Sequence, residues 1–279
     1  MPRTLKSRAA VAAVTALAAA AGLFVLQVLL PTAYPPRGAR PAGVLRIAAA
    51  NLFYANEHSD QVTAVLGRLD ADVIVALEWT GSNLELASLA GHGWRVALDA
   101  PRRGPHGALV LVRSTLEADA TLEPPPTAGP CPLPVVAVRV RAADTWVSVL
   151  GVHAPPPIEE CEETNLSTLR GLAGLVEDGR LERSLGAARA SDPVIVAGDL
   201  NASPASPGLE WLRGAGLVDA YALERWLPRG TWASEHGPHL ARVDYVLASR
   251  LVRVDGAWIV DLPGSDHRAV ITDLDLRGS

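Results

Sequence analysis

The segment Val194-Ile195-Val196-Ala197-Gly198-Asp199-Leu200-Asn201 runs directly from apolar residues into polar ones. Its apolar part, Pro193–Ala197, is short and rich in β-branched residues, which predicts a strand buried on both faces. Asp199 and Asn201 then lie just beyond the end of that strand. Strand ends along one edge of a sheet are where α/β enzymes assemble their sites. The segment therefore predicts chemistry at the edge of a buried sheet.

Polar residues at or beside the ends of apolar strands recur along the chain. A single such residue is ordinarily a cap or a turn, but five or six ends that all carry Asn, Asp, Glu or His are harder to explain in that way. Helical segments such as Ser59–Leu69 and Thr164–Leu185 lie between the strands, which predicts an α/β or α+β fold with mixed sheets in two or more layers. The polar residues are Asn51, Glu78, His153, Asp199, Asn201, Asp244, Asp266 and His267.

Oxygen donors dominate this set. Carboxylate and amide oxygens are hard ligands that suit Mg²⁺ or Mn²⁺ rather than tetrahedral zinc. The two histidines add the remaining parts of a metal-assisted hydrolase, in which the cation neutralises a phosphoryl oxygen and a His–Asp pair deprotonates water. The predicted chemistry is the hydrolysis of a phosphoester. The oxygen donors are Asn51, Glu78, Asp199, Asn201 and Asp266.

In this order along the chain, the motifs resemble those of the endonuclease/exonuclease/phosphatase superfamily, which includes DNase I-like nucleases, inositol-polyphosphate phosphatases and neutral sphingomyelinases. The resemblance covers about residues 44–275 and implies a four-layer fold, with two packed mixed sheets flanked by helices. The residues that carry it are Asn51, Glu78, the strand Gly107–Arg113, Val152-His153, Gly198-Asp199-Leu200-Asn201-Ala202-Ser203-Pro204, Arg242-Val243-Asp244-Tyr245-Val246-Leu247 and Ser265-Asp266-His267-Arg268-Ala269-Val270.

The resemblance also implies how the metal and the water are handled. Asn51 and Glu78 would hold the divalent metal, and Asp266 would lie near it. His267 would activate the water, held in orientation by Asp244. Whether one metal or two are used stays open.

The remaining residues of the motifs would handle the substrate. By the same resemblance, Asp199 and Asn201 would position the nucleophile or the phosphate. His153 would contact the phosphate or assist the leaving group.

The first 42 residues differ in composition from the rest. Residues 1–8 are basic, and the following 22 residues, 9–30, carry no charge. As a helix these 22 residues would be roughly 33 Å long, which predicts a transmembrane signal-anchor with a cytoplasmic N-terminus. The alternative is a signal peptide cleaved near Ala18-Ala19-Ala20, and both interpretations export the domain. Residues 31–42 hold four prolines and predict a linker to a catalytic domain over 43–279.

The two cysteines, Cys131 and Cys161, both follow the export segment and would face an oxidising exterior. Val135–Val140 and Trp146–Val152 predict an antiparallel hairpin, so the chain before the first strand and after the second emerges at the same end. The turn at Ala154–Pro157 would bring Cys161 back to a Cα separation of roughly 5.5–6 Å from its partner. We therefore expect a disulfide, against the alternative of two unpaired cysteines.

The charge of the chain bears on its substrate. Residues 1–42 hold five of the 25 basic residues and none of the 30 acidic ones, so residues 43–279 carry a net charge of −10. An acidic body repels long polyanions. We therefore expect a membrane-anchored, extracytoplasmic, monomeric phosphoesterase that uses Mg²⁺ or Mn²⁺ on a lipid-borne or small phosphate ester or diphosphate at the outer, membrane-facing surface. The alternatives are an exported DNase I-like nuclease and a catalytically inactive surface-binding module.

Overall fold

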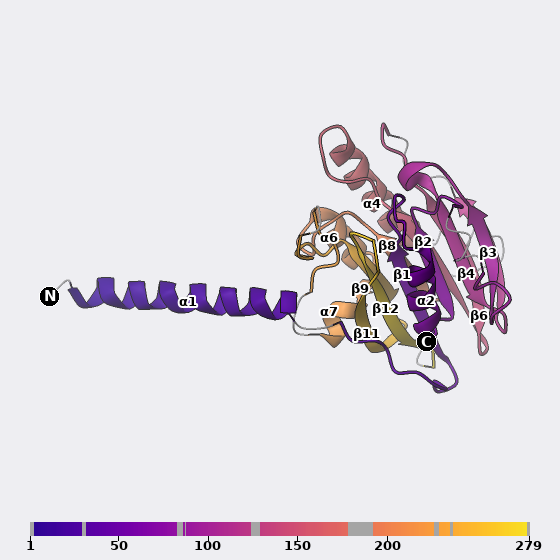
Figure 1. Cartoon of the computed structure of the whole chain (residues 1–279), viewed down its shortest axis with the longest axis horizontal. Helices are drawn as coiled ribbons and strands as arrows, with labels where there is room; N and C mark the ends of the chain where they lie inside the picture. Colours follow the sequence, from indigo (N-terminus) through magenta and orange to yellow (C-terminus); the bar gives the residue numbers. More distant parts are fainter. Residues whose placement is uncertain are drawn as a thin grey trace.

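Two six-stranded mixed sheets pack face to face, as the resemblance implied (Figure 1). The computed structural model describes residues 3–29, 32–82, 86, 88–123, 129–177, 192–225, 229–234 and 237–277. The strands of the first sheet, in the order in which they pair, are β11 (Arg253–Asp261), β12 (Arg268–Asp275), β1 (Val44–Asn51), β2 (Val73–Leu77), β4 (Ala108–Arg113) and β3 (Trp94–Ala100).

The second sheet is built in the same way. It contains one parallel pair, β7 with β8, as the first sheet contains β1 with β2, and the other pairs in both sheets are antiparallel. Its strands, in pairing order, are β5 (Glu117–Glu123), β6 (Val135–Ala142), β7 (Thr145–His153), β8 (Val194–Asp199), β10 (Asp244–Ser249) and β9 (Leu217–Asp219). The predicted hairpin is confirmed, because β6 and β7 pair antiparallel along their whole length.

The main apolar core lies between the two sheets and consists largely of Val, Ile, Leu and Ala side chains. Gly151 on β7 faces this layer at a point of very close approach. A Cβ atom there would lie 2.5 Å from Val136 Cγ2 in the same sheet and 2.7 Å from Val75 Cγ1 in the other sheet. A side chain at this position would push the sheets apart, so the packing distance depends on glycine.

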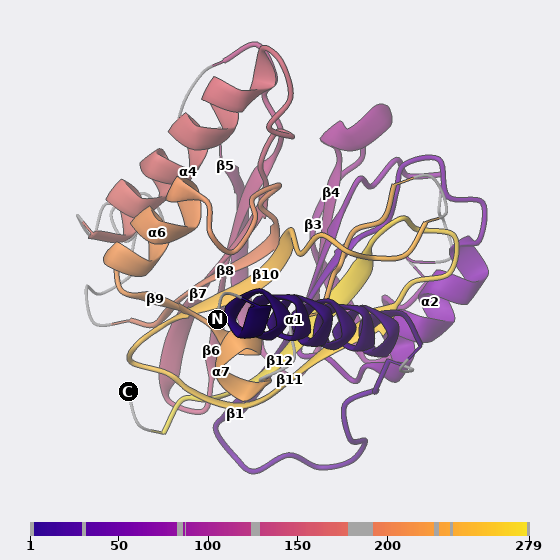
Figure 2. The same ribbon diagram turned by 90° about the vertical axis from the view of Figure 1, so that its left-hand side faces the viewer.

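Helices cover the outer faces of the two sheets. On the first sheet, α2 packs through Val62, Val65 and Leu66. On the second, α4 and α6 pack through residues such as Leu169, Leu172, Leu209 and Leu212. Figure 2 shows α2 on one side of the molecule and α4 with α6 on the other. The helices are α2 (Ser59–Arg68), α4 (Cys161–Glu177), α6 (Pro207–Gly214), the short α7 (Ala220–Glu224) and the 3-10 turn η1 (Gly104–His106).

The long helix predicted over Thr164–Leu185 begins three residues earlier than expected. As α4 it starts at Cys161 and is described as far as Glu177. The rest of the predicted helix lies outside the described residues.

The N-terminal helix α1 spans Arg3–Leu29 and projects from the two-sheet domain as a separate rod (Figure 1). The expectation of a transmembrane helix is not confirmed. A helix must offer roughly 20 apolar residues to cross a hydrocarbon core of about 30 Å. Within the described part of the chain, no helix is long and apolar enough to do so.

Candidate active site

One edge of the two sheets collects the polar residues predicted at the strand ends. In the first sheet, parallel strands β1 and β2 stop together, so that Asn51 lies beside the residue that precedes Glu78. In the second sheet, parallel strands β7 and β8 stop together, with His153 opposite Asp199. Antiparallel β10 begins at the same edge, with Asp244 opposite Asp199. The topology alone therefore brings five distant segments of the chain to one place.

Asn51 joins the two sheets at this edge. Its Nδ2 atom donates to Glu78 Oε1 at 3.0 Å and to Asp199 Oδ2 at 3.2 Å. Its own Oδ1 accepts from the backbone N–H of Phe53 at 3.1 Å, and the N–H of Tyr54 binds Glu78 Oε2 at 2.9 Å. The buried amide of Asn51 thus holds two carboxylates from different sheets at a fixed spacing.

His153 faces both of these carboxylates. Its Nε2 atom lies 3.6 Å from Asp199 Oδ2 and 4.0 Å from Glu78 Oε1, and its Nδ1 lies 3.2 Å from the carbonyl of Pro105. Burial, helped by the nearby charge of His267, lowers the pKa of His153 to about 4, so the ring is neutral at pH 7. With its single proton on Nδ1, directed at the carbonyl, the ring presents an Nε2 lone pair toward carboxylate oxygens.

His267 and Asp244 form the second pair of the site. Nδ1 of His267 lies 2.9 Å from Asp244 Oδ2, and its Nε2 lies 3.7 Å from Asp199 Oδ2. The backbone N–H of Asp244 donates to the hydroxyl of Thr231, and the N–H of His267 donates to the hydroxyl of Ser265. These bonds fix both partners, so the imidazole is held between two aspartates.

The charges of the site shift its pKa values strongly. Burial by itself lowers the pKa of His267, but the carboxylates of Asp244 and Asp199 outweigh it and raise that pKa to about 10. For Asp199, burial first and the charge of Asp244 second raise the pKa to about 7. Perturbed pKa values of this kind cluster at functional sites, because burial beside like charges disfavours the ionised form.

The backbone at this edge is unusual as well. Glu78, Phe53 and Asn201 adopt left-handed φ values of 60°, 60° and 46°. The N–H of Asn201 donates to Asp199 Oδ1 at 2.8 Å, and its side chain bridges to the carbonyl of Ala154. Left-handed non-glycine residues persist where the surrounding contacts hold them, often at sites of function. Strand patterns do not reveal this conformation, so sequence reasoning did not predict it.

Asp266 occupies a different position from the other acidic residues. Its Oδ2 accepts from the indole nitrogen of Trp232 at 3.2 Å, while its Oδ1 is buried and has no hydrogen-bond partner among the described residues. Trp232 pairs with both Ala241 and His267 through its backbone and is 37% exposed. Trp232, Thr231 and Ser265 were not predicted as site residues. Only their proximity to the Ser265-Asp266-His267 motif or to Asp244 could have indicated them.

The donor set fits a divalent cation. Oxygens of Glu78 and Asp199 converge on the Nε2 lone pair of His153, with the neutral amide of Asn51 as a donor to both carboxylates. Oδ1 of Asp266, whose charge acts on His267, has no hydrogen-bond partner among the described residues. Carboxylate and imidazole atoms of Asp199, Asp244 and His267 also lie within 4.8 Å of one another. Acceptors that face one another in a buried site require a proton or a cation. Mg²⁺ and Mn²⁺ match the oxygen-rich part of this set.

The family model of the endonuclease/exonuclease/phosphatase family matches residues 48–267. Solved structures share the fold at low identity. D. rerio TDP2 in complex with a single-strand DNA product has a TM-score of 0.67 and 15% identity, over 83% of this chain and 98% of that one. The 3′ phosphatase NExo from Neisseria, bound to a product DNA hairpin, has a TM-score of 0.64 and 16% identity, over 83% and 99%.

A bacterial relative is somewhat more similar in sequence. An endonuclease/exonuclease/phosphatase from Beutenbergia cavernae is 20% identical, with a TM-score of 0.60, over 84% of this chain and 72% of that one. No curated protein sequence matches the chain.

Fold and site together define a metal-dependent hydrolase of phosphoester bonds. The chain belongs to the endonuclease/exonuclease/phosphatase family, whose model matches well over half of its length. The predicted family, the packed mixed sheets and the enzyme class are therefore confirmed. The individual roles of the site residues stay predictions.

Proposed function

We propose that this enzyme hydrolyses a small or lipid-borne phosphoester or diphosphate with the help of Mg²⁺ or Mn²⁺. The observation that carries the proposal is the convergence of two buried histidines and three buried carboxylates at one sheet edge. Within it, the 2.9 Å contact between His267 and Asp244 supplies an oriented base beside Asp199. An oriented imidazole beside a cation site is the arrangement that phosphoester hydrolysis needs.

The cation would be held by Glu78, with Asn51 and Asp266 as further oxygen ligands. Bound there, it would neutralise charge that develops on the phosphoryl and leaving oxygens. Asn51 also keeps Glu78 and Asp199 at their observed spacing through its amide.

The remaining residues handle protons and the phosphate. The carboxylates of Asp244 and Asp199 keep His267 protonated at neutral pH in the metal-free site, and a cation bound beside the ring would favour its neutral form. In that form His267 would take a proton from water at Nε2, while Asp244 holds Nδ1 and stabilises the imidazolium that forms. Asp199 and Asn201 orient the water or the phosphate, because Asp199 lies within 4 Å of both histidines. His153, whose Nε2 lies 3.6 Å from Asp199 Oδ2, contacts the phosphate or assists the leaving group.

Charge favours a short substrate. The net charge of −10 over residues 43–279 opposes a long polyanion, whose binding depends on many cationic contacts. An exported nuclease is the second candidate, and it is favoured by the DNA products named for the TDP2 and NExo structures. The two candidates differ in salt dependence, because polynucleotide binding weakens steeply as salt rises.

We also propose that the enzyme works outside the cytoplasm. The disulfide between Cys131 and Cys161 supports this proposal, because structural disulfides persist in oxidising compartments. The basic and then apolar segment over residues 1–30 supports it too, because a sequence of this kind is typical of an export signal.

A substrate panel tests the proposal. The full-length chain is assayed with Mg²⁺ or Mn²⁺ against lipid phosphates, sphingomyelin, inositol phosphates and plasmid DNA. We expect turnover of a small or lipid-borne phosphoester that exceeds cleavage of DNA. Rapid DNA cleavage that falls steeply with salt, without turnover of the other substrates, would establish the nuclease instead.

A further inference from the structure

Asn165, in the second turn of α4, connects the two chain segments that leave the active-site edge. Its side chain is 2% exposed, and its Nδ2 atom donates to the carbonyl of Pro155 at 2.7 Å and to that of Leu200 at 3.0 Å. Pro155 follows two residues after His153, and Leu200 follows directly after Asp199. One buried amide group therefore binds the exits of β7 and β8.

The segments that follow β7 and β8 need such a connection, because the regular hydrogen bonds between the two strands end at the active-site edge. The pairing of β7 with β8 stops where His153 lies opposite Asp199. Beyond this point the N–H of Ala154 donates to the carbonyl of Asp199, and the side chain of Asn201 donates to the carbonyl of Ala154. Asn165 extends this set of bonds by one further residue on each strand.

The disulfide fixes the start of the helix that carries Asn165. Cys161 is the first residue of α4, one turn before Asn165, and its Cα atom lies 5.6 Å from that of Cys131. The segment around Cys131 also packs tightly on this turn. A Cβ atom at Gly129 would lie 2.3 Å from Thr164 Oγ1, so only glycine allows this approach.

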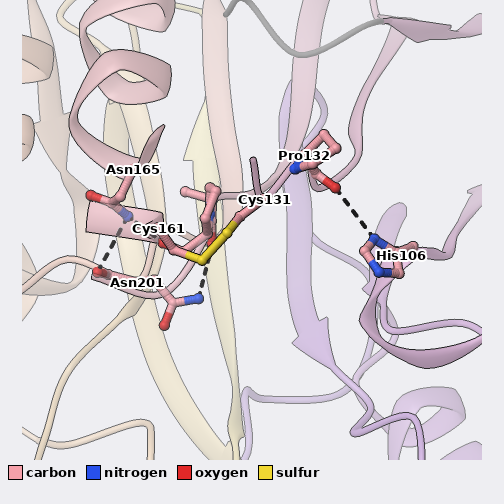
Figure 3. Close-up of a disulfide and its surroundings, with 8 residues drawn as sticks. His106, Cys131, Pro132, Cys161, Asn165 and Asn201 are labelled. Carbon is pink, nitrogen blue, oxygen red and sulfur yellow. Dashed lines mark hydrogen bonds between the residues drawn. A yellow bond between two sulfur atoms is a disulfide. The ribbon is translucent and has the colours of Figure 1, made fainter. Parts of the chain in front are cut away.

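On the Cys131 side, the disulfide is connected to His153 through Pro105 and His106. The carbonyl of Pro132, next to Cys131, lies 3.3 Å from Nδ1 of His106, and the neighbouring carbonyl of Pro105 lies 3.2 Å from Nδ1 of His153. Figure 3 shows the disulfide between these two groups, with Asn165 and Asn201 on one side and Pro132 and His106 on the other.

We propose that Asn165, held by the Cys131–Cys161 disulfide, is a positioning residue that sets the separation of His153 from Asp199. The inference rests on the proposed phosphoesterase function and adds a residue that acts through the carbonyls of Pro155 and Leu200. Asn165 also begins an Asn-Leu-Ser sequence of the kind that accepts glycans. Because its amide is buried and bonded, the folded protein uses this asparagine internally.

The test compares Asn165→Ala with a matched control on the same helix, Leu172→Ala, which removes a fully buried side chain that only packs. The full-length variants are assayed on bis(p-nitrophenyl) phosphate with Mg²⁺, at a temperature where both are folded. We expect Asn165→Ala to lower kcat by about 10–100-fold with little change in KM, the effect typical of losing a group that orients a site residue. Leu172→Ala lowers Tm and leaves kcat near that of the wild type.

A double cysteine variant and an NMR measurement without substrate test the same positioning role. Cys131→Ser/Cys161→Ser leaves Asn165 in place and removes its support, so we expect a smaller drop in kcat, reproduced in the wild type by a reductant. The imidazole NMR signals of His153 report its surroundings without any substrate, and we expect them to shift in Asn165→Ala. Wild-type kcat in both variants, or unmoved His153 signals, would overturn the positioning role. A wild type that hydrolyses nothing while the signals still shift would contradict the proposed function alone.

Discussion

Two groups of buried charged residues lie along β1, one around Arg46 near the start of the strand and one around Asn51 at its end. Their charges are neutralised in different ways. Arg46 is fully buried and binds Asp273 through two hydrogen bonds of 2.6 and 2.7 Å. Asp72 beside it accepts from the backbone of Arg46 and from the guanidinium of Arg40. Five residues further along β1, about 17 Å away at the usual rise of a strand, Asn51 enters the active-site edge.

At that edge, none of the described contacts of the carboxylates comes from an arginine. The contacts described for Glu78, Asp199 and Asp244 come from histidine rings, two side-chain amides and backbone N–H groups. In the Arg46 group each charge is paired with an opposite charge, and these ion pairs stabilise the fold. In the active-site group, acceptor atoms face one another. Buried charges are retained in such an arrangement where a ligand or a reaction uses them.

The largest expected effect is the loss of turnover when the active-site group is altered. We expect His267→Ala and Asp199→Asn each to lower kcat on a phosphodiester by about 10²–10⁴-fold, because each removes a positioned proton-transfer or orienting group. Tm should not fall for Asp199→Asn, since the substitution relieves repulsion with Asp244. Steady-state rates together with thermal denaturation check both statements. A variant that keeps the wild-type rate would remove its residue from the mechanism.

Substitutions in the Arg46 group should lower stability and leave turnover unchanged. Asp273→Asn leaves the buried Arg46 without its charge partner, so we expect the free energy of unfolding to fall by about 3–5 kcal/mol. Turnover per folded molecule should stay unchanged. Urea denaturation and kcat measure the two quantities. The exposed Arg253 offers a control, Arg253→Ala, that should change stability little, because its partner Asp275 keeps its ion pair with Arg277. Loss of kcat without loss of stability would mean that the two groups do not differ in role.

Cation binding should stabilise the folded protein through the active-site group and not through the Arg46 group. At a free Mn²⁺ concentration of one hundred times its Kd, the ion should raise the free energy of unfolding by about 2.7 kcal/mol, because it binds the folded state alone. Glu78→Gln should lose this gain, and Asp273→Asn should keep it. Thermal denaturation with and without Mn²⁺ measures the difference. An equal gain in the Glu78 variant would place the ion elsewhere.

The smallest effect concerns His239, which belongs to neither group. Burial, followed by the charge of Arg268, lowers its pKa to about 4. As the pH falls below about 6.5, the unfolded chain binds a proton at this residue before the folded chain does, so stability is lost between roughly pH 6.5 and 4. We expect Tm to fall less between pH 7 and pH 5 in His239→Gln than in the wild type. Equal falls would show that His239 does not contribute to acid sensitivity.

Much of the fold could be predicted because buried strands leave a clear pattern. Val194–Ala197 and the apolar residues of the β6–β7 hairpin contribute side chains both to the core between the sheets and to the layer under the helices, since each sheet is covered on both sides. Strand β5 carries no such pattern, because its sequence, Glu117–Glu123, begins by alternating acidic and small residues. That composition suits an edge strand, and β5 pairs only with β6.

The site could be predicted as a set of residues but not as a geometry. Strand-end positions brought Asn51, Glu78 and Asp199 together correctly, and the disulfide forms as expected. The partner of Asp266 could not be foreseen, because the bond to Trp232 depends on how residues 229–234 pair with Asp266 and with the start of β12. Local sequence carries no signal for such a tertiary contact.

The dependence of turnover on a divalent cation tests the account most directly. The full-length enzyme is stripped with EDTA, assayed on bis(p-nitrophenyl) phosphate, and assayed again after Mg²⁺ or Mn²⁺ is restored in excess. We predict that hydrolysis falls to the background rate in EDTA and returns with either ion, because none of the described contacts of Glu78 and Asp199 comes from an arginine that could replace it. Hydrolysis that continues unchanged in EDTA would contradict the assignment of this edge as a metal-dependent active site.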